Sequence, residues 1–306
     1  MKQHELLIAN HDAYPNSFQL SVQLFLEDAQ ARNLAPKTIS FYRERLRLFD
    51  QHVNRPLEQV DALTIRHYLA RRAQAGVKPA TLHADYRALS AFFSWCAREG
   101  LIDRSPMQQV RPPKREQVLK PALTPEQVQN LLTACEGKHW LRLRDRALIL
   151  LLLDTGLRIH EAHSLHAGDV LQGMLVIRGK GGKQRVVVLS AEVRLAIQRY
   201  LKACPFHPAG DSPLWYGQYG ALTLYGIQEV VRRAGRRAGL KLGAHQLRRT
   251  FATWSLRNGI DLEHLRLLMG HSDYRVLQQY LALVQEDLKR AHEEHSPLKT
   301  LRKQKR

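Results

Sequence analysis

Apolar residues in the first third of the chain recur every three or four positions, the spacing that places them on one face of an α-helix. Helix-start signals, Pro36-Lys37-Thr38, Asp61 and Lys78-Pro79, precede the last three of the four segments, and Gly100 follows the fourth. The pattern predicts a small helical bundle over residues 15–105. The apolar positions are Phe18, Val22, Phe25 and Leu26, then Ile39, Tyr42, Leu46 and Phe49, then Leu63, Ile65, Tyr68 and Leu69, and finally Leu82, Tyr86, Leu89, Phe92 and Phe93.

The pattern changes at residues 106–119, where Pro106, Pro112 and Pro113 stand among polar and basic residues. Prolines at this density break helices, so we expect an extended linker between two domains. Helical signals return at Thr124-Pro125-Glu126-Gln127, which has the residues of a capping box with proline at the first helical position. The run Ala147–Leu153 is apolar all round and predicts a buried helix, followed by a turn at Gly156 that brings Arg158 beside the core.

Two short runs rich in β-branched residues, Met174–Arg178 and Arg185–Leu189, flank the glycine-rich segment 179–184. This arrangement is typical of a β-hairpin with Lys180 and Lys183 in its loop. The second domain, over residues 120–296, is therefore expected to be mainly α with a small β-sheet. Residues 1–14 and the basic residues 297–306 are expected to form tails.

The composition favours a folded protein that binds a polyanion. Hydrophobic residues make up 44% and charged residues 25% of the 306 positions, which excludes wholesale disorder. The net charge is +19, and most of the basic excess follows residue 105, so nucleic acid is the expected partner. No apolar run approaches the roughly 20 residues of a membrane span, and the polar N-terminus lacks a signal-peptide stretch, so we expect a cytoplasmic, nucleoid-associated protein and no membrane partner.

Several residues suit phosphate chemistry. His245 and Arg248 are three residues apart on a predicted helix, so both can face one phosphate. His271 follows Gly270 at the expected end of another helix, and Tyr280 carries a hydroxyl that can attack phosphorus when fixed cations neutralise the developing charge. A cationic stripe suited to DNA phosphates is expected from Arg232, Arg233, Arg236 and Arg237.

The order of these residues, with their flanking segments, resembles the tyrosine recombinase (phage integrase) family and its Xer-like two-domain layout. The segments are Asp154-Thr-Gly-Leu-Arg158-Ile-His-Glu161, Gly179-Lys180-Gly-Gly-Lys-Gln-Arg, His245-Gln-Leu-Arg248-Arg-Thr-Phe-Ala-Thr, Leu268-Met-Gly-His271-Ser and Tyr280. The likeness covers residues 15–296 and implies that the helical N-terminal half is a SAM-like core-binding domain. It implies a tyrosine-recombinase catalytic domain in the second half.

By this resemblance, Tyr280 is the nucleophile that forms a 3′-phosphotyrosyl link and releases a 5′-hydroxyl. Arg158 and Arg248 match the two arginines that hold the non-bridging phosphate oxygens, a role for a permanently charged planar donor. Lys180 matches the general acid for the leaving oxygen, with Lys183 as the fallback. His245 matches a residue that assists proton transfer at the tyrosine, His271 a phosphate donor, and Glu161 an acidic residue that supports the site.

Some positions depart from the family pattern without removing a catalytic group. Arg249 stands where a histidine is common, Val276-Leu277 replace a frequent pair of threonines, and His160 and Ala162 flank Glu161 unusually. These departures bear on the subfamily and not on the chemistry. We expect Lys183 and Arg249 to contact DNA together with the arginine stripe.

The resemblance also implies partners: double-stranded DNA with a specific recombination site, and a tetramer of identical or related protomers on two such sites. No cofactor is expected, since the phosphotyrosyl link retains the bond energy. The segment His160–His166 lacks the spacing of a two-histidine zinc helix, and Gly179–Lys183 lacks the spacing of a nucleotide-binding loop, so neither a metal site nor ATP hydrolysis is expected. Two alternatives remain: a type IB topoisomerase-like enzyme, and a catalytically silent DNA-binding regulator of the same fold.

Overall fold

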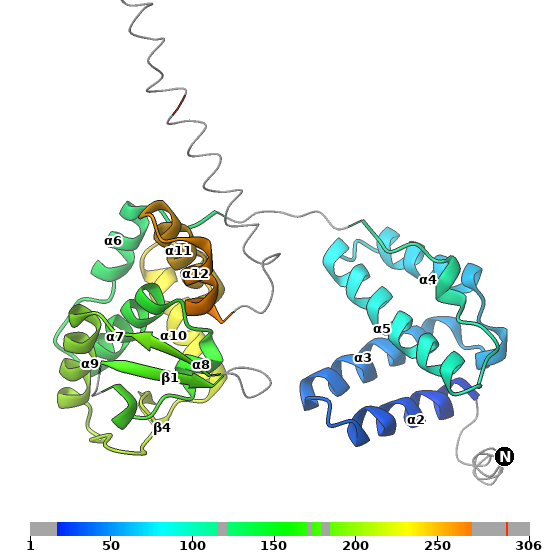
Figure 1. Ribbon diagram of the computed structural model, residues 1–306, viewed down its shortest axis with the longest axis horizontal. Helices are drawn as coiled ribbons and strands as arrows, with labels where there is room; N and C mark the ends of the chain where they lie inside the picture. Colours follow the sequence, from blue (N-terminus) through cyan, green and yellow to red (C-terminus); the bar gives the residue numbers. More distant parts are fainter. Residues whose placement is uncertain (1–16, 115–120, 171–172, 179–183, 271–291, 293–306) are drawn as a thin grey trace, which may run out of the picture. The chain divides into compact units, whose positions relative to one another are not determined.

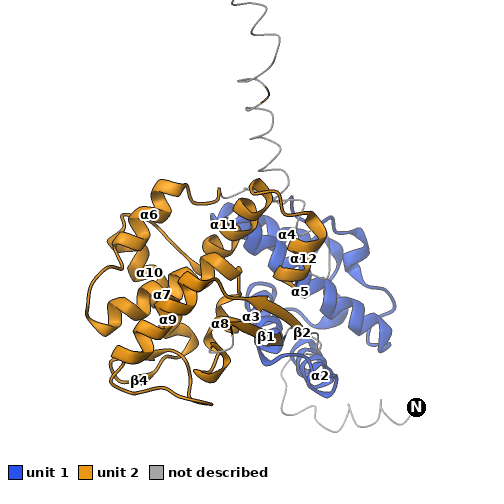
Figure 2. Cartoon of the chain, turned by 60° about the vertical axis from the view of Figure 1, so that its left-hand side comes forward, with its two compact units in different colours: residues 1–118 blue, residues 119–306 orange. Residues whose placement is uncertain are grey.

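The structure, a computed structural model, describes residues 17–114, 121–170, 173–178, 184–270 and 292. The chain divides into two compact units, Met1–Val118 and Leu119–Arg306 (Figure 2). Helices dominate the described part of both units, and the strands described there form two short antiparallel pairs in the second. The fold class expected from the sequence is therefore confirmed.

Between residues 17 and 114, unit 1 is a bundle of four α-helices, and each one coincides with a segment that the apolar spacing predicts (Figure 1). The prolines and Asp61 do act as start signals: Pro36 and Pro79 occupy first-turn positions, and the Asp61 carboxylate accepts a hydrogen bond from the Thr64 N–H. The helices are α2 (Ser17–Ala31), α3 (Pro36–Val53), α4 (Ala62–Gln74) and α5 (Pro79–Arg98), with a short 3₁₀ turn η1 (Leu57–Gln59) between α3 and α4.

Aromatic rings fill the centre of unit 1. Phe18 of α2 packs edge-to-face on Phe92 of α5 with ring centres 5.2 Å apart, and Phe25 meets the same ring at 5.6 Å. Phe49 of α3 adds a third contact, 5.5 Å from Phe18. Such tilted pairs contribute about 0.5–1.5 kcal/mol each beyond the apolar area they bury, so they fix how α2, α3 and α5 pack.

A buried carboxylate joins three helices of unit 1. Asp85 of α5 is 1% exposed and forms ion pairs with Arg45 of α3 and Arg72 of α4, each at 3.1 Å. Charges at such a site hold neighbouring helices in one register, because any slip would leave a buried charge without its partner.

The segment after α5 differs from the extended linker that its prolines predict. Pro106–Gln109 forms a 3₁₀ turn, η2, and Met107 and Val110 are buried in the core of unit 1. The Tyr86 hydroxyl donates to the Val110 carbonyl at 3.2 Å. The apolar residues between the prolines have therefore brought the first part of the expected linker into the helical unit.

Unit 2 is built around α7 (Trp140–Thr155), which contains the predicted apolar run. Leu148, Leu151 and Leu152 are fully buried, and α9 and α11 pack on the same helix. The predicted capping box is confirmed: the Thr124 hydroxyl accepts from Gln127 N–H at 3.2 Å, and the Gln127 side chain accepts from Thr124 N–H at 3.0 Å. The other helices are α6 (Pro125–Thr133), α8 (Ile159–His163), the 3₁₀ turn η3 (Gly168–Val170), α9 (Ala191–Ala203), α10 (Leu224–Arg237), α11 (Ala244–Arg257) and α12 (Leu262–Met269).

The predicted hairpin is present as β1 (Met174–Arg178) and β2 (Gln184–Val188), paired from Met174 opposite Val188 to Arg178 opposite Gln184. Its inner face places Leu175, Ile177 and Val187 in the core. A second, two-residue pair that the sequence did not predict joins β3 (Tyr216–Gly217) to β4 (Gly220–Ala221).

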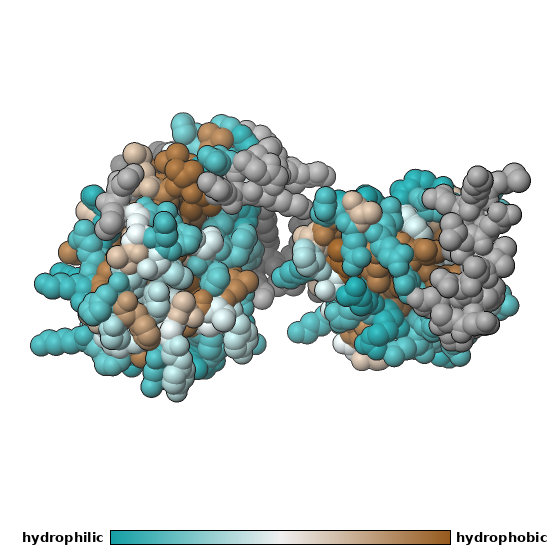
Figure 3. Space-filling model, turned by 90° about the horizontal axis from the view of Figure 1, so that it is seen from below, coloured by the Kyte–Doolittle hydropathy of each residue, from teal (hydrophilic) through white to brown (hydrophobic). Residues whose placement is uncertain are grey.

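Hydrophilic residues cover much of the face of each unit that Figure 3 shows. Cys96, Cys135 and Cys204 are buried free thiols. Within the described part of the chain, no helix has the length and apolar character needed to cross a bilayer.

Candidate active site

The site begins at a turn that only glycine fits. Gly156 ends α7 in the left-handed conformation (φ +60°), and a Cβ atom there would lie 2.2 Å from the Phe251 ring of α11. The chain then reverses into α8, where Arg158 is the N-cap residue and its side chain is 34% exposed. The turn therefore carries Arg158 to the edge of the core, as the sequence predicts.

Glu161 holds Arg158 from one turn further along. Its carboxylate accepts from the Arg158 backbone N–H at 2.7 Å and from Arg158 Nη1 at 3.0 Å. Burial of the carboxyl raises its pKa, but the hydrogen bonds from Arg185 and from the Arg158 backbone, with both guanidinium charges, outweigh burial and lower the pKa of Glu161 to about 2. Glu161 is thus a buried anion that fixes two cations.

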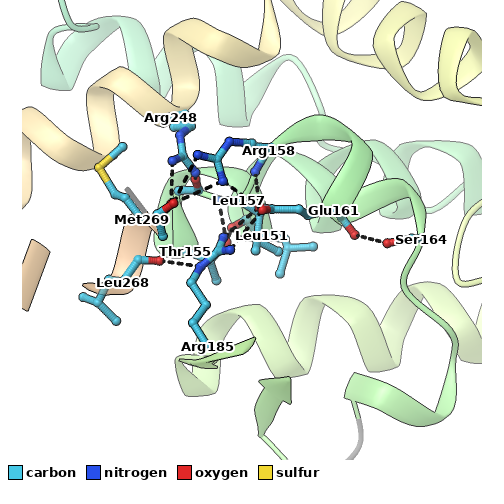
Figure 4. A network of polar contacts seen from close by, with 12 residues as sticks. Leu151, Thr155, Leu157, Arg158, Glu161, Ser164, Arg185, Arg248, Leu268 and Met269 are labelled. Carbon is cyan, nitrogen blue, oxygen red and sulfur yellow. Dashed lines mark hydrogen bonds and ion pairs between the residues drawn. The ribbon is translucent and has the colours of Figure 1, made fainter. Parts of the chain in front are cut away.

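Arg248 and Arg158 converge on one backbone oxygen although they are 90 residues apart in sequence (Figure 4). Arg248 Nη2 donates to the Met269 carbonyl at 2.7 Å, and Arg158 Nη1 reaches the same oxygen at 3.5 Å. Arg158 Nη2 lies 3.4 Å from the Gly270 carbonyl, and Arg248 Nη1 also donates to the Gly156 carbonyl. Arg248 is only 2% exposed, so its position is determined by these carbonyls.

His245 lies on α11 one turn before Arg248 and is exposed, as is expected of a residue that meets a ligand. Partial burial of the ring lowers the pKa of His245, and the charges of Arg249, Arg248 and Arg158 lower it further. The imidazole is therefore kept in its neutral form near pH 7, the form that can accept a proton.

Arg185 of β2 is a member of this site that the sequence reasoning missed. Its guanidinium forms a two-point pair with Glu161, at 2.9 and 2.7 Å, and its Nε donates to the Leu268 carbonyl at 2.8 Å. A signal was available: Arg185 alternates with the buried Val187 along β2, so it faces inward. An arginine on the inner face of a strand requires an anion there.

The remaining predicted catalytic residues, Lys180, His271 and Tyr280, lie outside the described residues, as does Lys183. Along the chain, α12 ends at Met269 and Gly270, so His271 is the next residue after the carbonyls that the arginines contact. The predicted motifs thus meet in the described part through Arg158, Glu161 and Arg248.

The arginine stripe of α10 is partly neutralised by the protein itself. Glu229 forms ion pairs with Arg232, Arg233 and Arg236 at 3.2, 3.5 and 2.6 Å. Arg237, at the end of the stripe, pairs with the buried Asp145 at 2.7 Å and donates to the Ala134 carbonyl at 3.1 Å. Its position is explained by that buried anion, which draws the guanidinium towards the core.

No group of three or more His, Cys, Asp or Glu side chains that could hold a metal ion is found among the residues that the structure describes. Within His160–His166, the His163 ring instead contacts the Leu222 carbonyl at 3.0 Å, and His166 lies beside Asp169.

The sequence profile of the Phage integrase family matches residues 121–286, and that of the phage integrase N-terminal SAM-like domain matches residues 22–100. This chain belongs to the phage integrase family. The two profiles fall on the two units, so the resemblance drawn from the motifs and the SAM-like interpretation of the N-terminal half are confirmed.

Relatives in this integrase family match most of the chain. A tyrosine recombinase XerD from Ralstonia nicotianae is 31% identical over 286 residues, covering 90% of this chain and 91% of that protein. A tyrosine recombinase XerC from Rhizobium meliloti is 33% identical, covering 82% of this chain and 85% of that protein. The Xer-like layout expected from the sequence agrees with these relatives.

Solved structures show the same fold. The XerH site-specific recombinase bound to a palindromic difH substrate superposes with a TM-score of 0.72 at 24% identity, over 92% of this chain and 85% of that one. A lambda integrase dimer bound to a COC′ core site gives 0.71 at 19% identity, over 85% and 93%.

Proposed function

We propose that the protein is a site-specific DNA recombinase that cuts and rejoins DNA strands through a covalent 3′-phosphotyrosyl intermediate, in integration, excision or resolution. The family, the XerD and XerC relatives and the fold of DNA-bound recombinases all support this function. Its substrate is double-stranded DNA with a specific recombination site.

One observation carries the proposal: Arg158 and Arg248 both direct a guanidinium nitrogen at the Met269 oxygen. Two planar cations that can share one oxygen acceptor can also share the non-bridging oxygens of one phosphate. Their hydrogen bonds would strengthen as negative charge grows on those oxygens in the transition state. Because backbone carbonyls already hold both guanidinium groups, these donors need little reorganisation when the phosphate arrives.

The chemistry then follows from the roles of the other residues. The Tyr280 hydroxyl oxygen attacks phosphorus, the P–O bond to tyrosine forms and the P–O5′ bond breaks. The neutral His245 imidazole accepts the tyrosine proton, and the Lys180 ammonium donates a proton to the leaving 5′-oxygen. His271 donates to the phosphate. The 5′-hydroxyl of the partner strand later reverses the step, so bond energy is conserved and no ATP is used.

The assembly is proposed to be a tetramer of identical or related protomers on two DNA sites, associated with the nucleoid where its substrate lies. Arg232, Arg233, Arg236, Lys183 and Arg249 are proposed to add contacts to the phosphate backbone. Arg249 lies on α11, and its charge is among those that lower the pKa of His245, which supports a place for its guanidinium near the predicted site.

A direct test is to incubate the protein with sheared DNA from its source genome, with EDTA and without ATP, and to sequence the SDS-resistant protein–DNA adducts. We expect adducts clustered at an inverted repeat, and none with Tyr280→Phe, which should still bind DNA. Adducts spread evenly over the genome would favour a topoisomerase-like enzyme. Specific binding without any adduct would favour the silent regulator.

A further inference from the structure

Arg185 connects segments that the proposed mechanism requires to act together. It lies on β2, is only 11% exposed, and uses all three guanidinium nitrogens (Figure 4). Nη1 and Nη2 donate to the two oxygens of Glu161, and Nε donates to the Leu268 carbonyl at the end of α12. One side chain therefore joins the hairpin, the start of α8 and the end of α12.

Two of the joined segments hold the predicted phosphate ligands Arg158 and Arg248. Glu161 also holds Arg158, and the carbonyls that follow Leu268 accept from Arg158 and Arg248. A shift of α12 relative to β2 would therefore move the oxygens that set the positions of both arginines.

Arg185 also controls how strongly Glu161 can hold Arg158. One carboxylate oxygen accepts from Arg158 Nη1 at 3.0 Å and Arg185 Nη1 at 2.9 Å. The other accepts from the Arg158 backbone N–H and from Arg185 Nη2, both at 2.7 Å. With both oxygens occupied, Arg158 has a single side-chain contact to Glu161. Its Nη2 is directed instead to the Gly270 carbonyl, away from the carboxylate.

The backbone leaves space for this arrangement. Gly270 adopts φ +61°, and a Cβ atom there would lie 2.9 Å from Arg185 Nη1 and 3.1 Å from its Cδ. Any side chain at this position would press on the guanidinium. The left-handed end of α12 thus brings its carbonyls within reach of three arginines at once.

We propose that Arg185 is a positioning residue of the strand-cleavage reaction. Its contacts with both oxygens of Glu161 hold Arg158 in place. Its contact with the Leu268 carbonyl holds the end of α12, which meets Arg248. Together these contacts keep the two arginines in the geometry needed to bind one phosphate. This inference rests on the proposed recombinase function. In the described part of the chain Arg185 contacts Glu161 and the Leu268 carbonyl, so it acts through Arg158 and the end of α12.

The test compares single-turnover adduct formation on two duplexes that carry the cleavage site mapped from the adducts. One has the natural phosphodiester at the scissile position, and the other has a methylphosphonate there. A methyl group in place of a non-bridging oxygen removes the negative charge of the phosphate, so the rate depends less on charge stabilisation by Arg158 and Arg248. Arg185→Met, Arg158→Met and the double variant are measured on both duplexes.

On the phosphodiester we expect Arg185→Met to react on the order of 10²-fold more slowly, the cost of misplaced reacting groups. On the methylphosphonate it should react within about tenfold of the unaltered protein. In a protein that already carries Arg158→Met, adding Arg185→Met should slow adduct formation by less than about tenfold, because the effects of substituting interacting residues do not add. Arg185→Lys, which keeps the charge but not the fork, should lie between.

Arg266→Met serves as the matched control. Arg266 lies on α12 like the contacted carbonyls, but its guanidinium pairs with the exposed Glu263 rather than with Glu161, so its substitution should leave both rates unchanged. DNA affinity and thermal unfolding are measured for each variant, and Arg185→Lys carries the comparison if Arg185→Met does not fold.

The outcomes are separable. If the unaltered protein forms no adduct on the phosphodiester, the proposed function fails and this inference fails with it. If the unaltered protein reacts but Arg185→Met is equally slow on both duplexes, and its effect adds fully to that of Arg158→Met, then Arg185 has only a structural role. An Arg185→Met protein with the original rate on the phosphodiester would also overturn the inference.

Discussion

The Glu161 carboxylate is the one described anion among the three guanidinium groups at the site, those of Arg158, Arg185 and Arg248. Repulsion between such cations would spread them apart, and the structure counters it with one buried carboxylate and three successive carbonyls at the end of α12. The carbonyls are the unpaired acceptors that every helix end leaves, so a negative helix terminus faces the cations. The carboxylate and the carbonyls therefore hold the three guanidinium cations together, and a bound phosphate would add further acceptors for them.

The depressed pKa of Glu161 predicts how stability depends on pH. The folded value is about 2 and the ordinary value 4.5, so the stabilisation is fully present above about pH 4.5 and is lost as pH falls towards 2. The difference corresponds to roughly 3 kcal/mol. We expect Glu161→Gln to lower the free energy of unfolding at pH 7, with the deficit shrinking below pH 4.5. Denaturant unfolding at several pH values measures this. Glu263→Gln, at an exposed pair, should show no such trend, and a deficit for Glu161→Gln that is constant with pH would contradict the assignment.

The lowered pKa of His245 predicts the acid limb of the cleavage rate. A neutral imidazole persists below the ordinary value of 6.5, so single-turnover adduct formation should hold its rate at pH 6.5 and decline only at lower pH. His245→Asn should slow the reaction about 10²-fold or more and remove that limb. A decline centred at or above pH 6.5 in the unaltered protein would show that His245 is not the proton acceptor.

At the residue scale, motifs predicted Arg158, Glu161 and Arg248 but missed Arg185. The first three stand in segments whose order resembles a known family, whereas Arg185 gains its role from a carboxylate 24 residues away and a carbonyl 83 residues away. The carbonyl acceptors are equally hidden, because every residue has one and only the packing of α12 selects Leu268, Met269 and Gly270.

The helices and turns explain why the site holds its shape. Local signals located most of them: the capping box at Thr124 and the prolines at Pro36 and Pro79 begin helices where the sequence predicts. The sequence was less informative where a tertiary contact determines the conformation of a segment. Residues 106–110 fold onto unit 1 because Met107 and Val110 are buried there, although the flanking prolines favour an extended segment.

The turn between α7 and α8 offers a test of how an element end positions the site. Gly156→Ala should destabilise unit 2 through two effects: a left-handed residue with a Cβ costs about 1–2 kcal/mol, and the Cβ atom would overlap the Phe251 ring of α11. Because Arg248 also lies on α11, strand cleavage should fall as well.

Gly239→Ala is the matched control for this turn. Gly239 has a similar φ of +69°, but a Cβ atom there would meet nothing within 4 Å. Thermal unfolding should therefore show the conformational cost alone for Gly239→Ala and a clearly larger loss for Gly156→Ala. Equal losses would mean that the contact with Phe251 contributes nothing to the turn.

At the scale of the whole molecule, the net charge of +19 predicted a polyanionic partner, and the family to which the chain belongs agrees with that inference. The structure refines which cations remain available. Arg237 is tied to the buried Asp145, whereas Arg233 and Arg236 are 68% and 62% exposed although both contact Glu229. Neighbouring arginines on one helix thus differ in how available their guanidinium groups are for contacts with DNA phosphates, and the net charge alone does not show this difference.

The salt dependence of DNA binding tests this distinction. A protein that contacts several phosphates releases nearly one counterion for each, so the logarithm of the association constant should fall linearly with the logarithm of salt concentration. Arg233→Met and Arg236→Met should each reduce that slope by about 0.9 if the side chain contacts a phosphate. Arg237→Met should leave the slope unchanged and lower the melting temperature instead, because it leaves Asp145 with one cation fewer. Filter-binding titrations from low to physiological salt give the slopes.

Two outcomes would contradict this prediction. A reduced slope for Arg237→Met would mean that its guanidinium leaves Asp145 for the DNA. Unchanged slopes for Arg233→Met and Arg236→Met would place the phosphate contacts elsewhere on the protein.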